Sequence, residues 1–327
     1  MIKELIVAAD GSGHFTNVQD AVDSVPEGNM QRVTIRIKKG IYKQKLFIEK
    51  PFIHLLGESV DETILTYDDS GLKVLPNGEN MGTFNSYSTF LGADDFSAEN
   101  ITFENIAGRG DIVGQALAAY VDADRMWFRN CRFLGSQDTL FTGPLPPKTI
   151  LPNGFKGPRE HAPRRLGRHY YENCFIQGDV DFIFGSAIAV FNRCEIFSND
   201  RNAEVNGYIT AASTPEGEEY GYVFMDCKLT GDAAPQTVYL GRPWRNYARV
   251  AFVNCWMGEH IKAEGWHNWD KTESERTVKF VEYNSSGPGG RTEGRVSWSR
   301  QLSGEEAEAY SIERVLSGKD GWNPTRY

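Results

Sequence analysis

The chain has 327 residues, 40% of them hydrophobic, and a formal net charge of −9 at pH 7. The negative charge argues against a nucleic-acid partner, and no apolar run approaches the ~20 residues that cross a membrane. The apolar run in the opening MIKELIVAADGSG is too short for the core of a signal peptide. We therefore expect a location in the cytoplasm, or secretion if a leader has been removed from the chain.

The first predicted element is a short helix that begins near Thr16. The run from Thr16 to Gln19 has the residue types of a capping box, in which side chains satisfy the free backbone N–H groups of the first turn. Apolar residues recur at helical spacing between residues 18 and 25, and Pro26 is expected to end the helix. From Val33 onward the pattern changes to apolar runs such as VTIRI, FIHLLG and TILTY, which Gly, Asn and Asp separate. These runs predict strands joined by tight turns.

A strand-rich unit recurs along the middle of the chain. The segments DRMWFRNCRFLG, HYYENCFIQG, AVFNRCEIFS, GYVFMDCKLTG and RVAFVNCWMG share a template of aromatic or β-branched residues before a Cys and an apolar residue after it. Successive cysteines from 174 to 255 are 20, 33 and 28 residues apart. Repetition at about 20 to 30 residues is typical of a solenoid. Because every unit contains strands, the solenoid is predicted to be a parallel β-helix.

The cysteines fit this repeat better than they fit redox or metal chemistry. No two form a CxxC pair, an odd number does not suit a disulfide framework, and their spacing does not suit zinc. We expect them to stack in one inward-facing ladder of small buried side chains. The five residues are Cys131, Cys174, Cys194, Cys227 and Cys255.

One region, from Thr142 to Arg168, departs from the repeat by its length and composition. It is rich in Pro and Gly and carries six basic residues against the single acid Glu160, a net charge of six minus one, +5. We expect a loop that projects from the wall of the solenoid. Our hypothesis is that this loop flanks a binding cleft and attracts a polyanion. The alternative is a solvated loop that covers a neighbouring coil.

The repeat fades after Trp269, and residues 270–327 are expected to form a C-terminal tail. Within it, Ser303 and Glu306 resemble a capping box at the start of a helix that ends near residues 317–318. Because repeat folds need protected ends, we expect this helix to cover the open side of the solenoid. Residues 1–327 would then form a single domain.

Polar residues interrupt the apolar strands at four places. Asp181 lies between Val180 and the run FIFG, where an unpaired carboxylate would be costly. The other clusters are GQA around Gln115, SQDTL around Gln137 and Asp138, and LGRPW around Arg242. Neighbouring strands lie about 5 Å apart, so the four clusters could meet on one wall. The chain has no G-x-S-x-G or H-E-x-x-H motif, which argues against a serine triad or a zinc hydrolase.

Three long segments, in the same order, carry a resemblance to a known family. GQALAAYVDADRMWFRNCRFLGSQDTLF, GDVDFIFGSA and YLGRPWRNYARVAF are similar to the pectin methylesterases, or pectinesterases. The opening VAADGSGHFTNVQDAVDSVP and the closing EYNSSGPGG also resemble that family, so the likeness spans nearly the whole chain. It implies an all-β, right-handed parallel β-helix that hydrolyses methyl esters of galacturonate residues in pectin or methylated oligogalacturonides. It also implies no cofactor, no metal and no partner beyond this substrate, and we expect a monomer.

The resemblance implies a role for each residue of the polar clusters. Asp181 would be the nucleophile that attacks the ester carbonyl, and Arg242 would keep it ionised and oriented. Asp138 would protonate the departing methanol and then activate water. Two amide side chains would donate to the oxyanion, and three aromatic side chains would offer flat faces to sugar rings. The amides are those of Gln115 and Gln137, and the aromatic residues are Trp244, Phe141 and Phe184.

Simpler interpretations stay open for the same residues. Asp181 and Arg242 could be a buried structural pair, and the two glutamines could form a ladder between coils. Asp179 is expected to be structural and is left out of the site. The remaining tryptophans are expected to pack in the core; they are Trp127, Trp256, Trp266, Trp269, Trp298 and Trp322. Two other functions remain as alternatives, a pectate lyase with a calcium-binding carboxylate cluster and a non-catalytic carbohydrate-binding solenoid.

Overall fold

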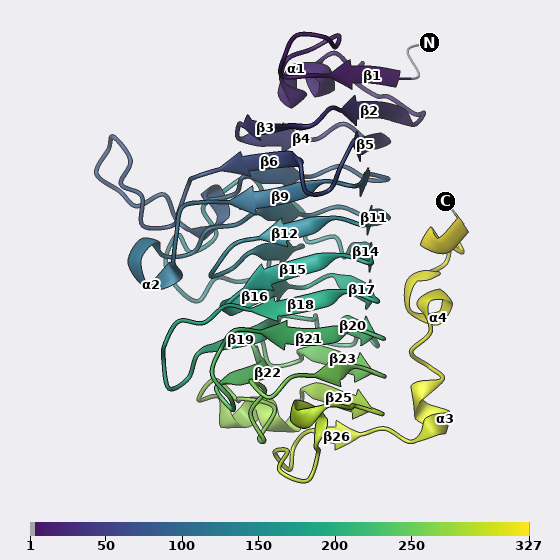
Figure 1. Ribbon diagram of the computed structural model, residues 1–327. Coiled ribbons are helices and arrows are strands. Elements are labelled where there is room, and N and C mark those ends of the chain that lie inside the picture. The colour runs from purple at the N-terminus through teal and green to yellow at the C-terminus, as the bar shows by residue number, and fades with distance from the viewer. Residues whose placement is uncertain (1–3, 327) are drawn as a thin grey trace.

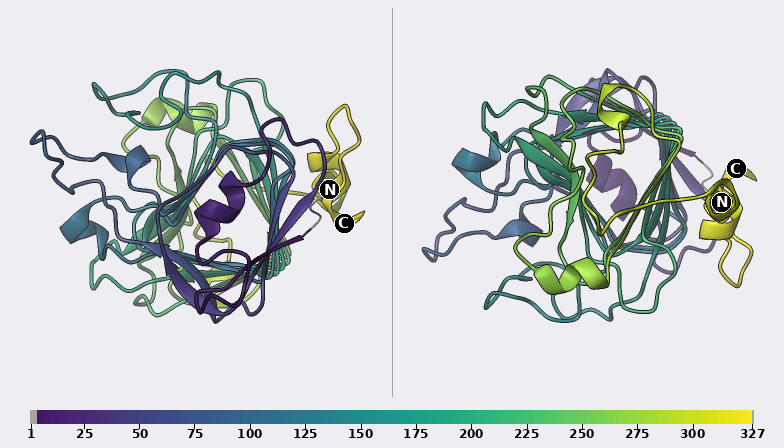
Figure 2. Two further views of the ribbon diagram at one scale, coloured as in Figure 1. Left: turned by 90° about the horizontal axis from the view of Figure 1, so that it is seen from above. Right: turned by 90° about the horizontal axis from the view of Figure 1, so that it is seen from below.

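The computed structural model describes residues 4–326, which wind into a tube of stacked coils (Figure 1). Three sheets of eleven, seven and eight strands run along the tube, and successive coils pair in parallel. Figure 2 shows the three sheets surrounding the axis of the tube. The predicted right-handed parallel β-helix is therefore confirmed. Within the described residues, no helix combines the length and the apolar character needed to cross a membrane.

The 11-stranded sheet has the most strands and runs from the first described residues to Gln301, within the C-terminal tail. It is formed by β1 (Glu4–Val7), β2 (Val33–Ile37), β5 (Ile53–Gly57), β8 (Ser97–Glu99), β11 (Met126–Arg129), β14 (Arg168–Glu172), β17 (Ile188–Asn192), β20 (Tyr222–Met225), β23 (Arg249–Val253), β25 (Lys279–Tyr283) and β26 (Arg300–Gln301). Since β25 and β26 extend it beyond Trp269, the coils continue further than the sequence repeat predicted.

The other two sheets complete the coils. The 8-stranded sheet contains β3 (Gly40–Lys43), β6 (Thr63–Tyr67), β9 (Thr102–Asn105), β12 (Arg132–Leu134), β15 (Phe175–Gly178), β18 (Glu195–Ser198), β21 (Lys228–Gly231) and β24 (Trp256–Met257). The 7-stranded sheet contains β4 (Leu46–Ile48), β7 (Thr89–Leu91), β10 (Ala119–Val121), β13 (Leu140–Thr142), β16 (Val180–Gly185), β19 (Gly207–Ala212) and β22 (Val238–Pro243). From β2 to β22 the chain therefore passes from the 11-stranded to the 8-stranded and then to the 7-stranded sheet in each coil.

The turn from the 11-stranded to the 8-stranded sheet explains the repeated Asn–Cys pattern. The residue before each Cys has a left-handed backbone, which Asn and Asp tolerate better than most residues. The next residue then points inward, and all five cysteines are buried without disulfide bonds. The strands that follow them are in register, so the predicted ladder of thiols is confirmed. The turn residues and their φ angles are Asn130 (48°), Asn173 (52°), Arg193 (54°), Asp226 (53°) and Asn254 (56°).

A column of stacked aromatic rings fills the core behind the 11-stranded sheet. Its members occupy equivalent positions in five successive coils: Phe128, Tyr171, Phe191, Phe224 and Phe252. Their ring centroids are 4.9, 4.7, 4.5 and 4.5 Å apart, with interplanar angles between 6° and 13°. Each inner ring therefore contacts a ring above and a ring below, so its loss would affect two interfaces between coils.

Phe191→Ala is expected to lower the free energy of unfolding by about 3–5 kcal/mol, because it opens a cavity in the middle of this column. Phe191→Leu should cost less, since it keeps most of the buried volume. The matched control is Phe197→Ala on β18, where the ring is only partly buried and the cost should be about 1 kcal/mol or less. Urea unfolding followed by circular dichroism measures all three. Equal losses for Phe191→Ala and Phe197→Ala would contradict the importance of the column.

The N-terminal end of the tube is closed by α1 (Val18–Asp23), which packs Val18 and Val22 into the main core (Figure 2). The predicted capping box was wrong by one residue. Asn17 is the N-cap, and its side chain accepts a hydrogen bond from the backbone N–H of Asp20 at 2.8 Å. Gln19 instead bonds to the main chain of Phe47 in β4 and so ties the helix to the 7-stranded sheet.

The C-terminal tail contains two short helices, α3 (Gly304–Ala307) and α4 (Ile312–Leu316), and not the single helix that was predicted. The capping box of Ser303 and Glu306 is confirmed, but Ser311 caps a second helix after a break. The two helices also do not cover an open end of the tube, whereas Trp298, earlier in the tail, packs against the main core. They lie along the outer face of the 11-stranded sheet (Figure 1), because that face presents a stripe of apolar side chains to them.

Candidate active site

A cavity of about 400 Å³ lies beside the 7-stranded sheet and brings together all four polar clusters found in the sequence. Strands β16, β19 and β22 contribute to its wall, together with the turns before β10 and β13 and the loop 143–167. The lining residues are Thr83, Phe84, Gln115, Gln137, Asp138, Thr149, Ile150, Leu151, Gly154, Phe155, Asp181, Phe184, Ala211, Arg242, Trp244, Arg245 and Trp269.

Asp181 lies in an irregular part of β16. The register between β16 and β19 shifts between Val180 and Ile183, so Asp181 and Phe182 stand opposite the single residue Ile209. Asp181 has a φ of 50°, a left-handed conformation that costs an ordinary residue ~1–3 kcal/mol. The bulge lets Phe182 stay in the core while Asp181 faces the cavity. Strand β16 thus holds a carboxylate at a position that regular pairing would not provide.

Arg242 on β22 binds Asp181 through two parallel hydrogen bonds. Its Nε donates to Oδ1 at 2.8 Å and its Nη2 to Oδ2 at 2.7 Å. The guanidinium group lies between two aromatic rings, with its Cζ 3.8 Å from the ring centroid of Tyr208 and 3.7 Å from that of Trp269. Burial raises the pKa of Asp181, and the charge and hydrogen bonds of Arg242 oppose this rise. This pairing favours the ionised form of the carboxylate.

Asp138 lies in the turn before β13, with a φ of 63° and only 7% of its surface exposed. Its backbone N–H donates to the carbonyl oxygen of Val180 at 3.0 Å, which fixes this turn against the coil that carries Asp181. Burial raises the pKa of Asp138 well above its ordinary value, and the negative charge of Asp181 raises it further. Because the arginine ion pair belongs to Asp181, Asp138 is the one of the two carboxyl groups that binds its proton more strongly.

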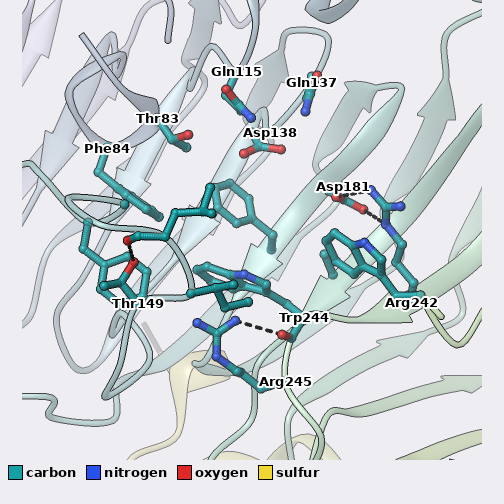
Figure 3. Close-up of a pocket in the computed structure, with 17 residues that line it drawn as sticks. Thr83, Phe84, Gln115, Gln137, Asp138, Thr149, Asp181, Arg242, Trp244 and Arg245 are labelled. Atoms are coloured by element: carbon teal, nitrogen blue, oxygen red, sulfur yellow. Dashed lines mark hydrogen bonds and ion pairs between the residues drawn. The ribbon is translucent and has the colours of Figure 1, made fainter. Parts of the chain in front are cut away.

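Gln115 and Gln137 come from two neighbouring coils and lie next to Asp138 (Figure 3). The backbone N–H of Ala116 donates to the carbonyl oxygen of Gln137 at 3.2 Å, which sets the register of the two turns. Gly110, in α2 (Gly110–Val113), packs directly on Gln137, where an added Cβ would lie 2.4 Å from the glutamine Cβ. The backbone around both amides is therefore shaped to hold them at the cavity.

Two of the three aromatic residues predicted to contact a ligand lie at the cavity. Phe184 and Trp244 line the cavity, but Phe141 has no exposed surface and packs beneath Phe84 and Phe184. Phe141 was therefore wrongly placed among the residues that contact a ligand. Leu140 points into the core, so its neighbour Phe141 points to the outer face of β13, where a ligand could reach it. Phe84 covers that outer face and buries Phe141.

Trp269 is a site residue that the sequence did not reveal, since it was expected to pack in the core. It lines the cavity and covers the guanidinium group of Arg242, whereas Trp266, three residues earlier, is buried. Nothing in the local pattern distinguishes the two. Trp127, Trp298 and Trp322 pack as expected, while Trp256 is 41% exposed.

Asp179 is buried outside the cavity lining, and its carboxylate accepts from the backbone N–H of Val180 at 2.7 Å.

The loop 143–167 flanks the cavity, as hypothesised, and Phe155 anchors it. The Phe155 ring packs edge-on against Phe84 and Trp244, with centroid distances of 5.7 and 6.2 Å. Arg245 ties the loop to the far rim by donating to the carbonyl oxygen of Lys148 at 2.9 Å. The loop therefore forms a fixed wall that adds five residues to the lining.

Most of the basic side chains that gave this loop its positive charge are bound to other groups. Lys156 pairs with Glu79 at 2.6 Å, Arg159 with Glu49 at 3.2 Å, and Arg165 with Asp94. Arg164 donates to three main-chain carbonyl oxygens of the loop itself. Arg168 is the first residue of β14 and binds Asp124 and Asp320 at 2.7 and 2.8 Å. These contacts stabilise the loop and tail, and they reduce the charge available to attract a polyanion.

The only carboxyl groups among the lining residues are Asp138 and Asp181. Across residues 4–326, no three or more His, Cys, Asp or Glu side chains are grouped so that they could hold a metal ion. One carboxyl group paired with an arginine and one with a strongly raised pKa, beside two neutral amide donors, form a site suited to acyl transfer. Fold and site together define a β-helical enzyme with a carboxylate pair.

Comparison with known proteins identifies the family. The pectinesterase family model matches residues 4–144 and 162–319. The chain is 41% identical to pectinesterase 31 of Arabidopsis thaliana over 308 residues, covering 92% of this chain and 88% of that protein. The structure of pectin methylesterase from carrot superposes with a TM-score of 0.82, at 30% identity, covering 99% of this chain and 96% of that one. For PemA from Erwinia chrysanthemi the TM-score is 0.78, at 27% identity over 98% of both chains.

The chain belongs to the pectinesterase family and is a carboxylic ester hydrolase. The family model leaves out residues 145–161, which lie within the loop that flanks the cavity. The matched residues thus include the carboxylate pair, and the wall formed by residues 149–155 lies outside the match.

Proposed function

We propose that this protein hydrolyses the methyl esters of galacturonate residues in pectin or methylated oligogalacturonides and releases methanol. The observation that carries the proposal is the pairing of Asp181 with Arg242 in a cavity that also contains the buried Asp138. A solved pectin methylesterase in complex with a hexasaccharide, 27% identical to this chain with a TM-score of 0.79, supports a pectic oligosaccharide as the substrate.

In the first step, an Asp181 oxygen attacks the ester carbonyl carbon and forms a tetrahedral intermediate. The amide N–H groups of Gln115 and Gln137 donate to the developing oxyanion. The C–O bond to the methoxy group then breaks, and the proton of Asp138 passes to the methoxy oxygen. Methanol leaves, and the galacturonyl group remains on Asp181 as an acid anhydride.

In the second step, the now ionised Asp138 removes a proton from a water molecule that attacks the anhydride carbonyl. The bond to Asp181 breaks, so the free carboxyl group of the substrate and the Asp181 carboxylate are regenerated. Asp138 has regained its proton. Arg242 stabilises the carboxylate that is consumed and re-formed, and its contacts with Tyr208 and Trp269 keep the guanidinium in the plane of that carboxylate.

Gln137→Ala is expected to lower kcat by about 10²–10³-fold with a smaller change in KM, because it removes a donor to the oxyanion. The matched control is Gln177→Ala on β15, where the amide donates to Asn199 at 2.7 Å and does not line the cavity. Methanol release at saturating methylated pectin measures both variants. Similar kcat values for the two would assign Gln137 to the packing between coils.

The function itself is tested by the products formed from methylated pectin in the presence of EDTA. We expect methanol, with no new absorbance from unsaturated sugar products. Unsaturated products that disappear when EDTA is added would favour the calcium-dependent lyase. Binding of pectin without methanol release would favour a carbohydrate-binding solenoid.

A further inference from the structure

Trp269 is presented to the cavity by a strained turn. The chain bonds to β22 as far as His267, whose backbone N–H donates to the carbonyl oxygen of Gly241 at 3.1 Å. It then leaves the strand through Trp269 and Asp270, which both have a φ of 56°. A left-handed backbone is costly for residues other than Gly, so two of them in succession persist only where surrounding contacts fix them.

The side chain of Lys271, at the end of this turn, fastens it to β22 and to the residue that follows. Its Nζ donates to the carbonyl oxygen of Pro243 at 2.9 Å and to that of Trp244 at 3.3 Å. The same ammonium group lies 4.4 Å from the ring centroid of Trp269, within the range of a cation–π contact. One side chain thus contacts both tryptophans that line the cavity, the main chain of one and the ring of the other.

Lys271 is half-buried among charged groups of the site. Burial, together with the nearby guanidinium groups of Arg245 and Arg242, lowers the pKa of Lys271 to about 8. The carboxylates of Asp181 and Glu273 act in the opposite direction. The side chain therefore loses its charge within the pH range of an ordinary assay. A neutral amine still donates hydrogen bonds, but it loses most of its attraction for the indole ring.

We infer that Lys271 is a positioning residue, which fixes Trp244 and Trp269 relative to each other and so sets the shape of the aromatic surface that receives the sugar rings. The inference rests on the proposed function, because it gives this surface a part in binding pectin. Arg242 keeps its two hydrogen bonds to Asp181 without Lys271. Loss of Lys271 should therefore weaken substrate binding more than it slows the chemical step.

The first test is Lys271→Met, which keeps the length of the side chain and removes its charge and its donors. At pH 7 we expect KM for methylated pectin to rise about tenfold with kcat within about twofold of wild type, the signature of lost binding. The matched control is Lys279→Met on β25. Lys279 is also partly buried, has a lowered pKa and lies 5.6 Å from the ring centroid of Tyr310 in the C-terminal tail. Both constants of this control should match those of wild type.

The pH dependence of KM distinguishes positioning by a cation from a role in folding alone. Wild-type KM should rise about fivefold between pH 7 and pH 9, as Lys271 loses its proton. Lys271→Arg carries a cation throughout this range, so its KM should stay close to the wild-type value at pH 7. Lys271→Met should have a high KM at every pH. Methanol released without enzyme is subtracted at each pH, because base also cleaves methyl esters.

A KM for Lys271→Met within about twofold of wild type would overturn the inference, as would an alkaline rise in KM that persists in Lys271→Arg. Equal losses in Lys271→Met and Lys279→Met would overturn it too, because they would assign both lysines to folding alone. These results leave methanol release by the wild type intact. The absence of methanol from the wild-type reaction would overturn the proposed function itself.

Discussion

Asp181→Asn is expected to lower kcat for methanol release by a factor of about 10⁴ to 10⁶, the range seen when a nucleophile or its partner is removed. The asparagine amide is a poor nucleophile and cannot form the anhydride on which the second step depends. The protein should still fold, because the Asn oxygen can accept one of the two hydrogen bonds from Arg242. Its stability should fall, since the buried guanidinium group loses its counter-charge.

The matched control for this variant is Asp179→Asn. Asp179 is a buried carboxyl group two residues away on the same chain segment, and it does not line the cavity. Methanol release should therefore change little, while thermal unfolding reports any effect on folding in both variants. Full methanol release by Asp181→Asn would rule it out as the nucleophile and leave the pair with Arg242 as a structural contact.

Asp138→Asn is expected to have opposite effects on activity and on stability. It removes the proton donor and the base, which should lower kcat by about 10²–10⁴-fold. At neutral pH it should raise the melting temperature. Burial and Asp181 raise the pKa of Asp138 in the folded protein, so the folded state binds more protons than the unfolded state above about pH 4. The free energy of unfolding of the wild type therefore falls as pH rises through this window. The Asn side chain of the variant does not titrate, so the variant lacks this decrease in the free energy of unfolding.

Melting temperatures of wild type and Asp138→Asn at several pH values measure this effect. The difference should be largest near neutral pH and should shrink as pH approaches 4, where the unfolded wild type also becomes protonated. The control Asp61→Asn changes a side chain that is 72% exposed and should have little effect at any pH. A melting temperature for Asp138→Asn at or below that of wild type at neutral pH would show that the Asp138 carboxyl group is not destabilising.

The sequence predicted the coils because one local rule recurs in them. The residue before each Cys has a positive φ and is Asn or Asp, which tolerate it, in four of the five turns, with Arg193 the exception. A turn such as that at Asn130 or Asn254 could therefore be recognised without long-range information. The polar clusters could be expected to converge for the same reason, since parallel coils bring equivalent positions together.

Other features depend on packing that no local pattern records. Trp266 and Trp269 have similar surroundings in the sequence, and only the fold sends one to the core and the other to Arg242. Phe141 lies where strand alternation exposes it, but Phe84 from another coil covers it. The bulge that aims Asp181 outward is a shift between two strands, which a single strand does not reveal.

The C-terminal tail changes how this tube should come apart. In a solenoid each coil contacts only its neighbours, so stability is approximately a sum of local terms and coils can unfold one at a time from either end. Here a single apolar cluster joins Leu316 and Trp322 of the tail to residues from Trp127 on β11 to Val281 on β25. Arg168 adds hydrogen bonds to the carbonyl oxygens of Leu316 and Ser317. Coils that do not touch one another are thus linked because they all pack against the same C-terminal tail. Pulling or heating should therefore unfold the coils in the middle of the tube in one cooperative step.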